Sequence, residues 1–204
     1  MSEQPETCKV ALFGGHNTGK TLQIRHLIET YGAKNVGIVS CEHGLGTIES
    51  VLDGVGKKEP RNLKEFKDAW SWARDTYQGK DKWVCIDGGT RVIQWSANDL
   101  IQGTDAAFIE LAMGKQKNQV TEALRPYLRF ISNEGNIDGR KLWPSIAWDT
   151  DYEMSRWIGL ECNHYWTFWD DQGWINEKKT GPWMIDAPGR SEERRVGKEC
   201  RYRW

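Results

Sequence analysis

The chain has 204 residues, of which 38% are hydrophobic and 28% are charged. Such a composition suits a globular domain with a sizeable core and argues against intrinsic disorder. A net charge of −1 excludes a global basic field of the kind that signals nucleic-acid binding, although a local basic groove stays open. The five cysteines are widely spaced and include no CxxC pair, which fits neither a disulfide framework nor a zinc site.

The first half of the chain alternates between short apolar runs and amphipathic stretches. In chain order, we expect a disordered start over residues 1–8, a buried strand over 9–13, a helix over 21–31, a strand over 35–41, a short helix over 46–52, a polar loop over 54–60, a helix over 63–77 and a strand over 82–87. No window of the chain approaches the ~20 apolar residues that a membrane span requires.

The second half is predicted in the same way. In chain order, we expect a helix over 91–101, one or two helices around Pro126 within 105–134, a polar loop over 133–144, a helix over 146–161, a strand over 163–169 and a hairpin over 174–185. The alternation of strands and helices predicts an α/β domain with a mostly parallel sheet flanked by helices.

A phosphate-binding motif follows the first predicted strand. Residues 14–21 read GGHNTGKT and match GxxxxGK[ST] with a strand before it and a helix after it, which is the context of a P-loop. In such a loop backbone N–H groups surround a phosphate, a lysine reaches the β- and γ-phosphates of ATP, and a hydroxyl joins the Mg²⁺ shell. The candidate ATP-binding residues are Gly14, Gly15, His16, Asn17, Thr18, Gly19, Lys20 and Thr21.

Two acidic residues complete the predicted site. Asp87 ends the apolar run WVCID and resembles a Walker B aspartate, so we expect it to hold Mg²⁺ together with Thr21. Glu42 follows the next apolar run after the motif. A carboxylate there is suited to accept a proton from the water that attacks ATP, although it also fits an exposed acid at a strand end. The candidate catalytic residues are therefore Lys20, Glu42 and Asp87.

These features resemble the RecA-like P-loop ATPases, and most closely the phage-encoded RecA-like proteins, some of which act in single-strand annealing and recombination. The resemblance covers residues 10–189 and rests on the motif, Glu42, the string IDGGT at 86–90, and a late strand followed by a hairpin that ends IDAPG. It implies a RecA-like core over 9–189, Mg²⁺-dependent ATP hydrolysis, single-stranded DNA as partner, a homo-oligomer, and a cytoplasmic location (the host cytoplasm if the chain is phage-encoded). In a RecA-like sheet we also expect the strand before Glu42 to lie beside the strand that precedes the motif. It also places Thr90 near a strand-end Ser/Thr position and Gln172 near a sensor position.

Several alternatives stay open. A nucleotide or small-molecule kinase would share the motif, and so would an ATP-gated assembly or packaging factor that hydrolyses slowly. The basic side chains Lys115, Lys117, Arg125 and Arg129 fit a solvated helix face, a DNA-backbone contact or an arginine finger. The twelve tryptophans fit either core packing or a stacking platform for bases.

The last stretch of the chain differs from the rest. Residues 190–204 are rich in arginine, without apolar periodicity, and they resemble the translation of a common sequencing adapter at every position except Tyr202. We expect a non-native tail here, with the natural protein continuing beyond Gly189, rather than a basic arm that binds nucleic acid.

Overall fold

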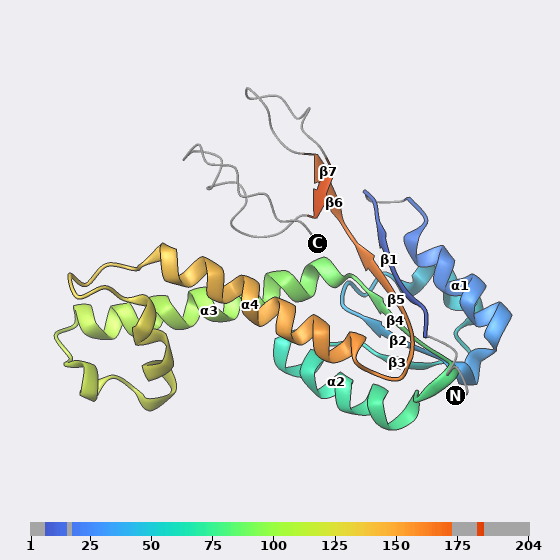
Figure 1. Cartoon of the computed structure of the whole chain (residues 1–204), viewed down its shortest axis with the longest axis horizontal. Coiled ribbons are helices and arrows are strands. Elements are labelled where there is room, and N and C mark those ends of the chain that lie inside the picture. The colour runs from blue at the N-terminus through green and yellow to red at the C-terminus, as the bar shows by residue number, and fades with distance from the viewer. Residues whose placement is uncertain (1–6, 16–17, 173–182, 186–204) are drawn as a thin grey trace, which may run out of the picture. The chain divides into compact units, whose positions relative to one another are not determined.

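The computed structural model describes residues 7–15, 18–172 and 183–185, and side chains are described up to Trp169 (Figure 1). The described residues divide into two compact units, of which the first lies within residues 7–95 and 149–185 and the second within residues 96–148. His16, Asn17, the turn of the predicted hairpin and the tail over 190–204 lie outside the described residues.

The first unit is built on a five-stranded sheet in which all pairings are parallel. Its strands lie in the order β1-β5-β4-β2-β3. Their bounds are β1 Lys9–Phe13, β2 Val36–Ser40, β3 Gly56–Lys58, β4 Gly79–Asp87 and β5 Cys162–Phe168. This arrangement confirms the predicted α/β class, and because the strands are parallel, all of their carboxyl ends meet at one edge of the sheet.

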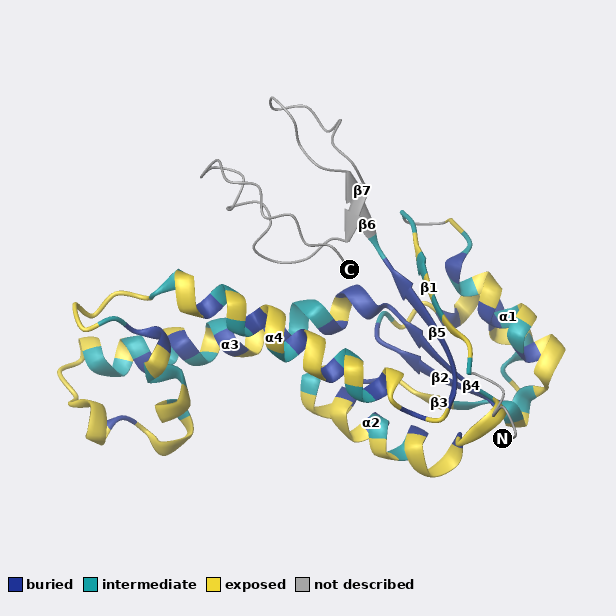
Figure 2. Ribbon diagram, in the orientation of Figure 1, coloured by how far each residue is buried: buried dark blue, intermediate teal, exposed yellow. Residues whose placement is uncertain are grey.

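Helices cover both faces of this sheet, and the period-2 alternation of the strands determines which side chain meets which helix. On one face Cys85 and Ile38 pack with Ile24 of α1 (Lys20–Tyr31) and with η2 (Leu45–Val51). On the other face Ile86 packs with Phe66 of α2 (Leu63–Thr76) and with Trp157. β2, β5 and the part of β4 from Trp83 onward are accordingly buried, whereas the outward sides of the helices are exposed (Figure 2).

The second unit has its own small core. It contains the later turns of α3 (Gly89–Ala112), η3 (Lys117–Gln119), η4 (Glu122–Phe130) and the earlier turns of α4 (Gly139–Ile158). The buried side chains that form this core are Ala97, Leu100, Phe130, Leu142 and Ile146. Pro126 lies inside η4, so the predicted helix around this proline takes the tighter 3₁₀ form.

Two predicted loops contain regular structure. Residues 54–60 include β3. This strand was not predicted, because an edge strand with two lysines shows no alternation of apolar and polar residues. Residues 133–144 include the start of α4, although Pro144 removes one backbone donor from that helix. Burial of Leu142 and Ile146 on either side of this proline compensates for the loss.

Two short strands follow β5. β6 (Asp170–Gln172) pairs antiparallel with β7 (Trp183–Ile185). β7 falls within the predicted hairpin over 174–185, whereas β6 lies before it, and residues 173–182 lie outside the described residues. Within the described part of the chain, no helix is both long enough and apolar enough to cross a membrane.

Candidate functional site

The predicted site residues gather at the carboxyl edge of the parallel sheet. Residues 14–21 follow β1, Glu42 follows β2 and Asp87 ends β4. This edge is where α/β sheets bind their ligands, because the loops that leave the strands and the first turns of the following helices meet there.

Lys20 closes the segment that follows β1 onto itself. Its ammonium Nζ donates hydrogen bonds to the carbonyl oxygens of Gly14 at 2.6 Å and Gly15 at 2.7 Å. The Thr18 hydroxyl donates to the same Gly15 carbonyl at 2.9 Å. Gly19 has φ 80°, in the left-handed region that glycine adopts without strain, and this turn starts α1 at Lys20. Gly14, Gly15 and Thr18 therefore contact one buried cation.

The hydroxyl of Thr21 meets the carboxylate of Asp87. Thr21 Oγ1 lies 3.2 Å from Oδ1 and 3.3 Å from Oδ2, although the two residues are 66 positions apart in the chain. A second hydroxyl, that of Thr167 in β5, donates to Oδ1 at 2.8 Å. Burial raises the pKa of Asp87, while the hydrogen bonds from Thr167 and Thr21 and the charge of Lys20 act in the opposite direction.

Glu42 reaches the site by a route that the sequence did not indicate. We expected its strand to lie beside β1, but this was wrong, because β5 and β4 separate β2 from β1. The backbone beyond β2 instead bends over the end of β4, where Cys41 N donates to Asp87 O at 2.8 Å. His43 has φ 54°, a left-handed conformation uncommon outside glycine, and thereby allows this bend.

The side chain of Glu42 lies directly against Gly88. A Cβ atom placed on Gly88 would come within 2.4 Å of Glu42 Cγ, and Gly88 itself has φ 94°. Only glycine combines that conformation with room for a neighbouring side chain. The residue after Asp87 is therefore small because Glu42 occupies the adjacent space.

The environment of Glu42 favours its neutral form. Burial is the main cause, the charge of Asp87 adds to it, and together they raise the pKa of Glu42 to about 7. Lys20, Arg91 and a hydrogen bond from the side chain of Trp169 lower it in part. Oε1 of Glu42 is buried and has no hydrogen-bond partner among the described residues. The carboxylate therefore presents one acceptor atom that no described protein group satisfies.

Sequence reasoning did not select Thr167 and Trp169 as site residues. Thr167 donates to Asp87 and also accepts a hydrogen bond from the backbone N of Gly88 at 2.8 Å. Trp169 contacts Glu42, and its backbone N donates to the hydroxyl of Thr90 at 2.8 Å. A hydroxyl residue near the end of an apolar strand was the available signal for Thr167. The side chain of Gln172, the predicted sensor, lies outside the described side chains.

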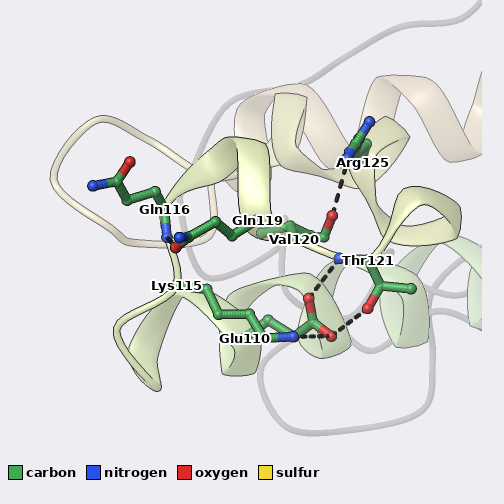
Figure 3. Close-up of polar contacts among 7 residues, drawn as sticks. All are labelled: Glu110, Lys115, Gln116, Gln119, Val120, Thr121 and Arg125. Carbon is green, nitrogen blue, oxygen red and sulfur yellow. Dashed lines mark hydrogen bonds and ion pairs between the residues drawn. The ribbon is translucent and has the colours of Figure 1, made fainter.

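The predicted basic stripe is largely occupied by contacts within the second unit (Figure 3). Lys115 pairs with Glu110 at 3.0 Å, and Arg125 donates to the carbonyl oxygens of Val120 and Asn118. The guanidinium of Arg129 lies over the Phe130 ring, 4.6 Å from its centroid. These contacts fold the segment between α3 and α4, which favours a structural role over a DNA-backbone contact.

Glu110 is the centre of this network. Its carboxylate accepts hydrogen bonds from the backbone N and the hydroxyl of Thr121, at 2.8 Å and 2.6 Å (Figure 3). These bonds, the hydroxyl first, together with Lys115 lower the pKa of Glu110 to about 2.

Comparison with known proteins adds no relative to this picture. No protein-family model, curated protein or solved structure matches the chain.

Proposed function

We propose that this protein binds ATP with Mg²⁺ in a RecA-like P-loop fold and hydrolyses it to ADP and phosphate. The observation that carries the proposal is the 3.2 Å contact between the Thr21 hydroxyl and the Asp87 carboxylate, one residue beyond a buried lysine that the loop carbonyls surround. A hydroxyl at the end of the glycine-rich loop and an aspartate at the end of another strand form the metal-binding pair of P-loop nucleotide sites.

The loop fits a polyphosphate. Lys20 Nζ already lies among the carbonyl oxygens of Gly14 and Gly15, and phosphate oxygens offer stronger, charged hydrogen-bond acceptors to the same ammonium group. The start of α1 at Lys20 adds backbone N–H groups and the positive end of a helix dipole. An anion in the curl of this loop thus meets a cation and oriented donors.

The oxygen atoms of Thr21 and Asp87 fit Mg²⁺. This metal prefers oxygen ligands and is usually held by one or two carboxylates together with water and substrate phosphates. When bound, it supplies positive charge to the phosphate oxygens. Thr167 and Thr21 donate to Asp87 and thereby favour its ionised form, which is the form that binds a cation.

Glu42 is the proposed general base. Its carboxylate lies near Asp87, and its buried Oε1 has no hydrogen-bond partner among the described residues. A carboxylate base can serve water in hydrolysis or an acceptor hydroxyl in a kinase, so the choice of hydrolysis rests on the RecA-like resemblance. The RecA-like resemblance extends the proposal to recombination on single-stranded DNA by a homo-oligomer, whereas an ATP-gated assembly factor would use the same residues with slower turnover.

One assay separates these functions. Release of phosphate from ATP is measured with and without single-stranded DNA, and phosphoryl transfer to added nucleosides is measured in parallel, with Lys20→Ala as the control. Turnover that rises with single-stranded DNA and is absent from the control supports the proposal. Transfer to an acceptor would support a kinase, and ATP binding with negligible turnover would support a gated assembly factor.

A further inference from the structure

The end of β5 contacts every part of the site. The carbonyl oxygen of Phe168 accepts a hydrogen bond from Gly14 N at 3.2 Å, so this strand holds the first residue of the loop. The preceding residue, Thr167, donates to Asp87. The following residue, Trp169, contacts Glu42 through its side chain. Three consecutive residues therefore reach the phosphate loop, the candidate metal ligand and the candidate base.

Trp169 is held firmly at this position. Its backbone N donates to the hydroxyl of Thr90 at 2.8 Å, and Thr90 is fully buried at the start of α3. The residue before Trp169, Phe168, packs closely against Gly89. A Cβ atom placed on Gly89 would come within 2.5 Å of the Phe168 ring. The indole therefore extends from a fixed backbone toward Glu42.

We propose that Trp169 is a positioning residue that orients the Glu42 carboxylate for the attack of water on ATP. This inference rests on the proposed ATPase function. The indole N–H holds the carboxylate and leaves the buried Oε1 without a described partner. In the reaction the water oxygen bonds to the γ-phosphorus, the bond from phosphorus to the bridging oxygen breaks, ADP leaves with that electron pair, and the Glu42 carboxylate receives the water proton.

An indole is chemically suited to this task. Its N–H is a donor without an acceptor, so it fixes the rotation of the carboxylate and does not compete for the proton of the water. A glutamate side chain otherwise rotates about three bonds, and a base displaced by about 1 Å loses much of its effect. The hydroxyl of Thr90 acts one step further away by holding the backbone of Trp169.

The first test is Trp169→Phe, which keeps an aromatic ring and removes the donor. We expect kcat for ATP hydrolysis to fall roughly tenfold or more, while KM for ATP stays within about twofold, because Lys20 and Thr21 are unchanged. Trp70→Phe is the matched control, since it also removes an indole hydrogen bond, of 3.0 Å to Arg156 O. Thr90→Val should lower kcat in the same direction, whereas Thr90→Ser keeps the hydroxyl and should retain wild-type kcat.

The second test repeats Trp169→Phe and Thr90→Val in a Glu42→Gln background. If both residues act through Glu42, each should cause little further loss there. Equal fold losses in the two backgrounds, or a KM effect in place of a kcat effect, would overturn the inference and leave the ATPase proposal intact. A wild-type protein that binds ATP without turnover would overturn the ATPase proposal, and this inference with it.

Discussion

The Thr167 hydroxyl bridges Asp87 and Gly88, because it donates to Asp87 Oδ1 at 2.8 Å and accepts from Gly88 N at 2.8 Å. Its single proton is directed to the carboxylate, since the backbone N–H supplies the other bond. The end of β5 thereby stabilises both the charge of Asp87 and the left-handed turn that follows it.

Removal of this hydroxyl should weaken the proposed Mg²⁺ site. In Thr167→Val we expect the pKa of Asp87 to rise further, because the hydrogen bond from Thr167 that opposes the effect of burial is lost. The Mg²⁺ concentration for half-maximal ATP turnover should increase several-fold, which a magnesium titration measures. Thr167→Ser restores the donor and should behave as wild type. An unchanged Mg²⁺ dependence in the valine variant would show that Thr167 only supports the fold.

Asp87→Asn should affect turnover more than nucleotide binding. The amide keeps the shape of the side chain but carries no charge, and that charge matters most for a cation as the γ-phosphate departs. We expect ATP affinity to change by less than about tenfold and Mg²⁺-dependent kcat to fall by about 10²-fold or more. Wild-type turnover in this variant would reduce Asp87 to a structural residue at a strand end.

Lys20→Ala should abolish ATP binding without unfolding the chain. The ammonium contacts the Gly14 and Gly15 carbonyls. Its loss removes the positive charge that we propose binds the β- and γ-phosphates. Isothermal titration with ATP measures the affinity, and thermal melting monitors the fold. Normal affinity in a folded variant would contradict the assignment of the loop.

Glu42→Gln should separate ATP binding from hydrolysis and remove a pH dependence. We expect ATP still to bind and single-turnover hydrolysis to fall by about 10²-fold or more. With the Glu42 pKa near 7, kcat/KM of the wild type should rise as pH increases through about 7, because only the ionised carboxylate accepts a proton. An unchanged rate in the glutamine variant would remove the role of Glu42 as base.

The same substitution has a stability signature that does not depend on activity. The folded pKa of Glu42, about 7, lies above the ordinary value of 4.5, so the folded chain holds a proton that the unfolded chain releases. The stabilising contribution is complete below about 4.5 and is lost as pH rises through about 7. The melting temperature of the wild type should therefore fall relative to that of Glu42→Gln across this range.

Gly88→Ala should displace Glu42. The added methyl group would lie 2.4 Å from Glu42 Cγ, and φ 94° costs an alanine about 1–2 kcal/mol. We expect both a lower melting temperature and a loss of kcat. Gly44→Ala is the control, because Gly44 has negative φ and no heavy atom lies within 4 Å of the place that an added Cβ would take. Equal behaviour of the two variants would argue against close packing at Gly88.

Local patterns were sufficient for the elements of the first unit. Apolar runs at strand spacing and the glycine before α1 predicted β1, α1, β2 and β5 to within a residue or two, because short-range propensity and long-range burial agree there. The same patterns placed Asp87 at a strand end. Such patterns missed β3, because this edge strand shows no alternation of apolar and polar residues. They also missed the start of α4, where the helix continues through Pro144 because the side chains around it are buried in a core.

The candidate site divides along the same line. The sequence by itself determined that a lysine, a threonine and two acids follow or end predicted strands. Each of these residues lies within or directly beside the motif or the apolar run that identifies it. Only the tertiary structure decided that β5 lies between β1 and β4, and hence that Thr167 and Trp169 reach Asp87 and Glu42. The contacts of Thr167 join segments 79 and 80 residues apart, and no local pattern carries information over that separation.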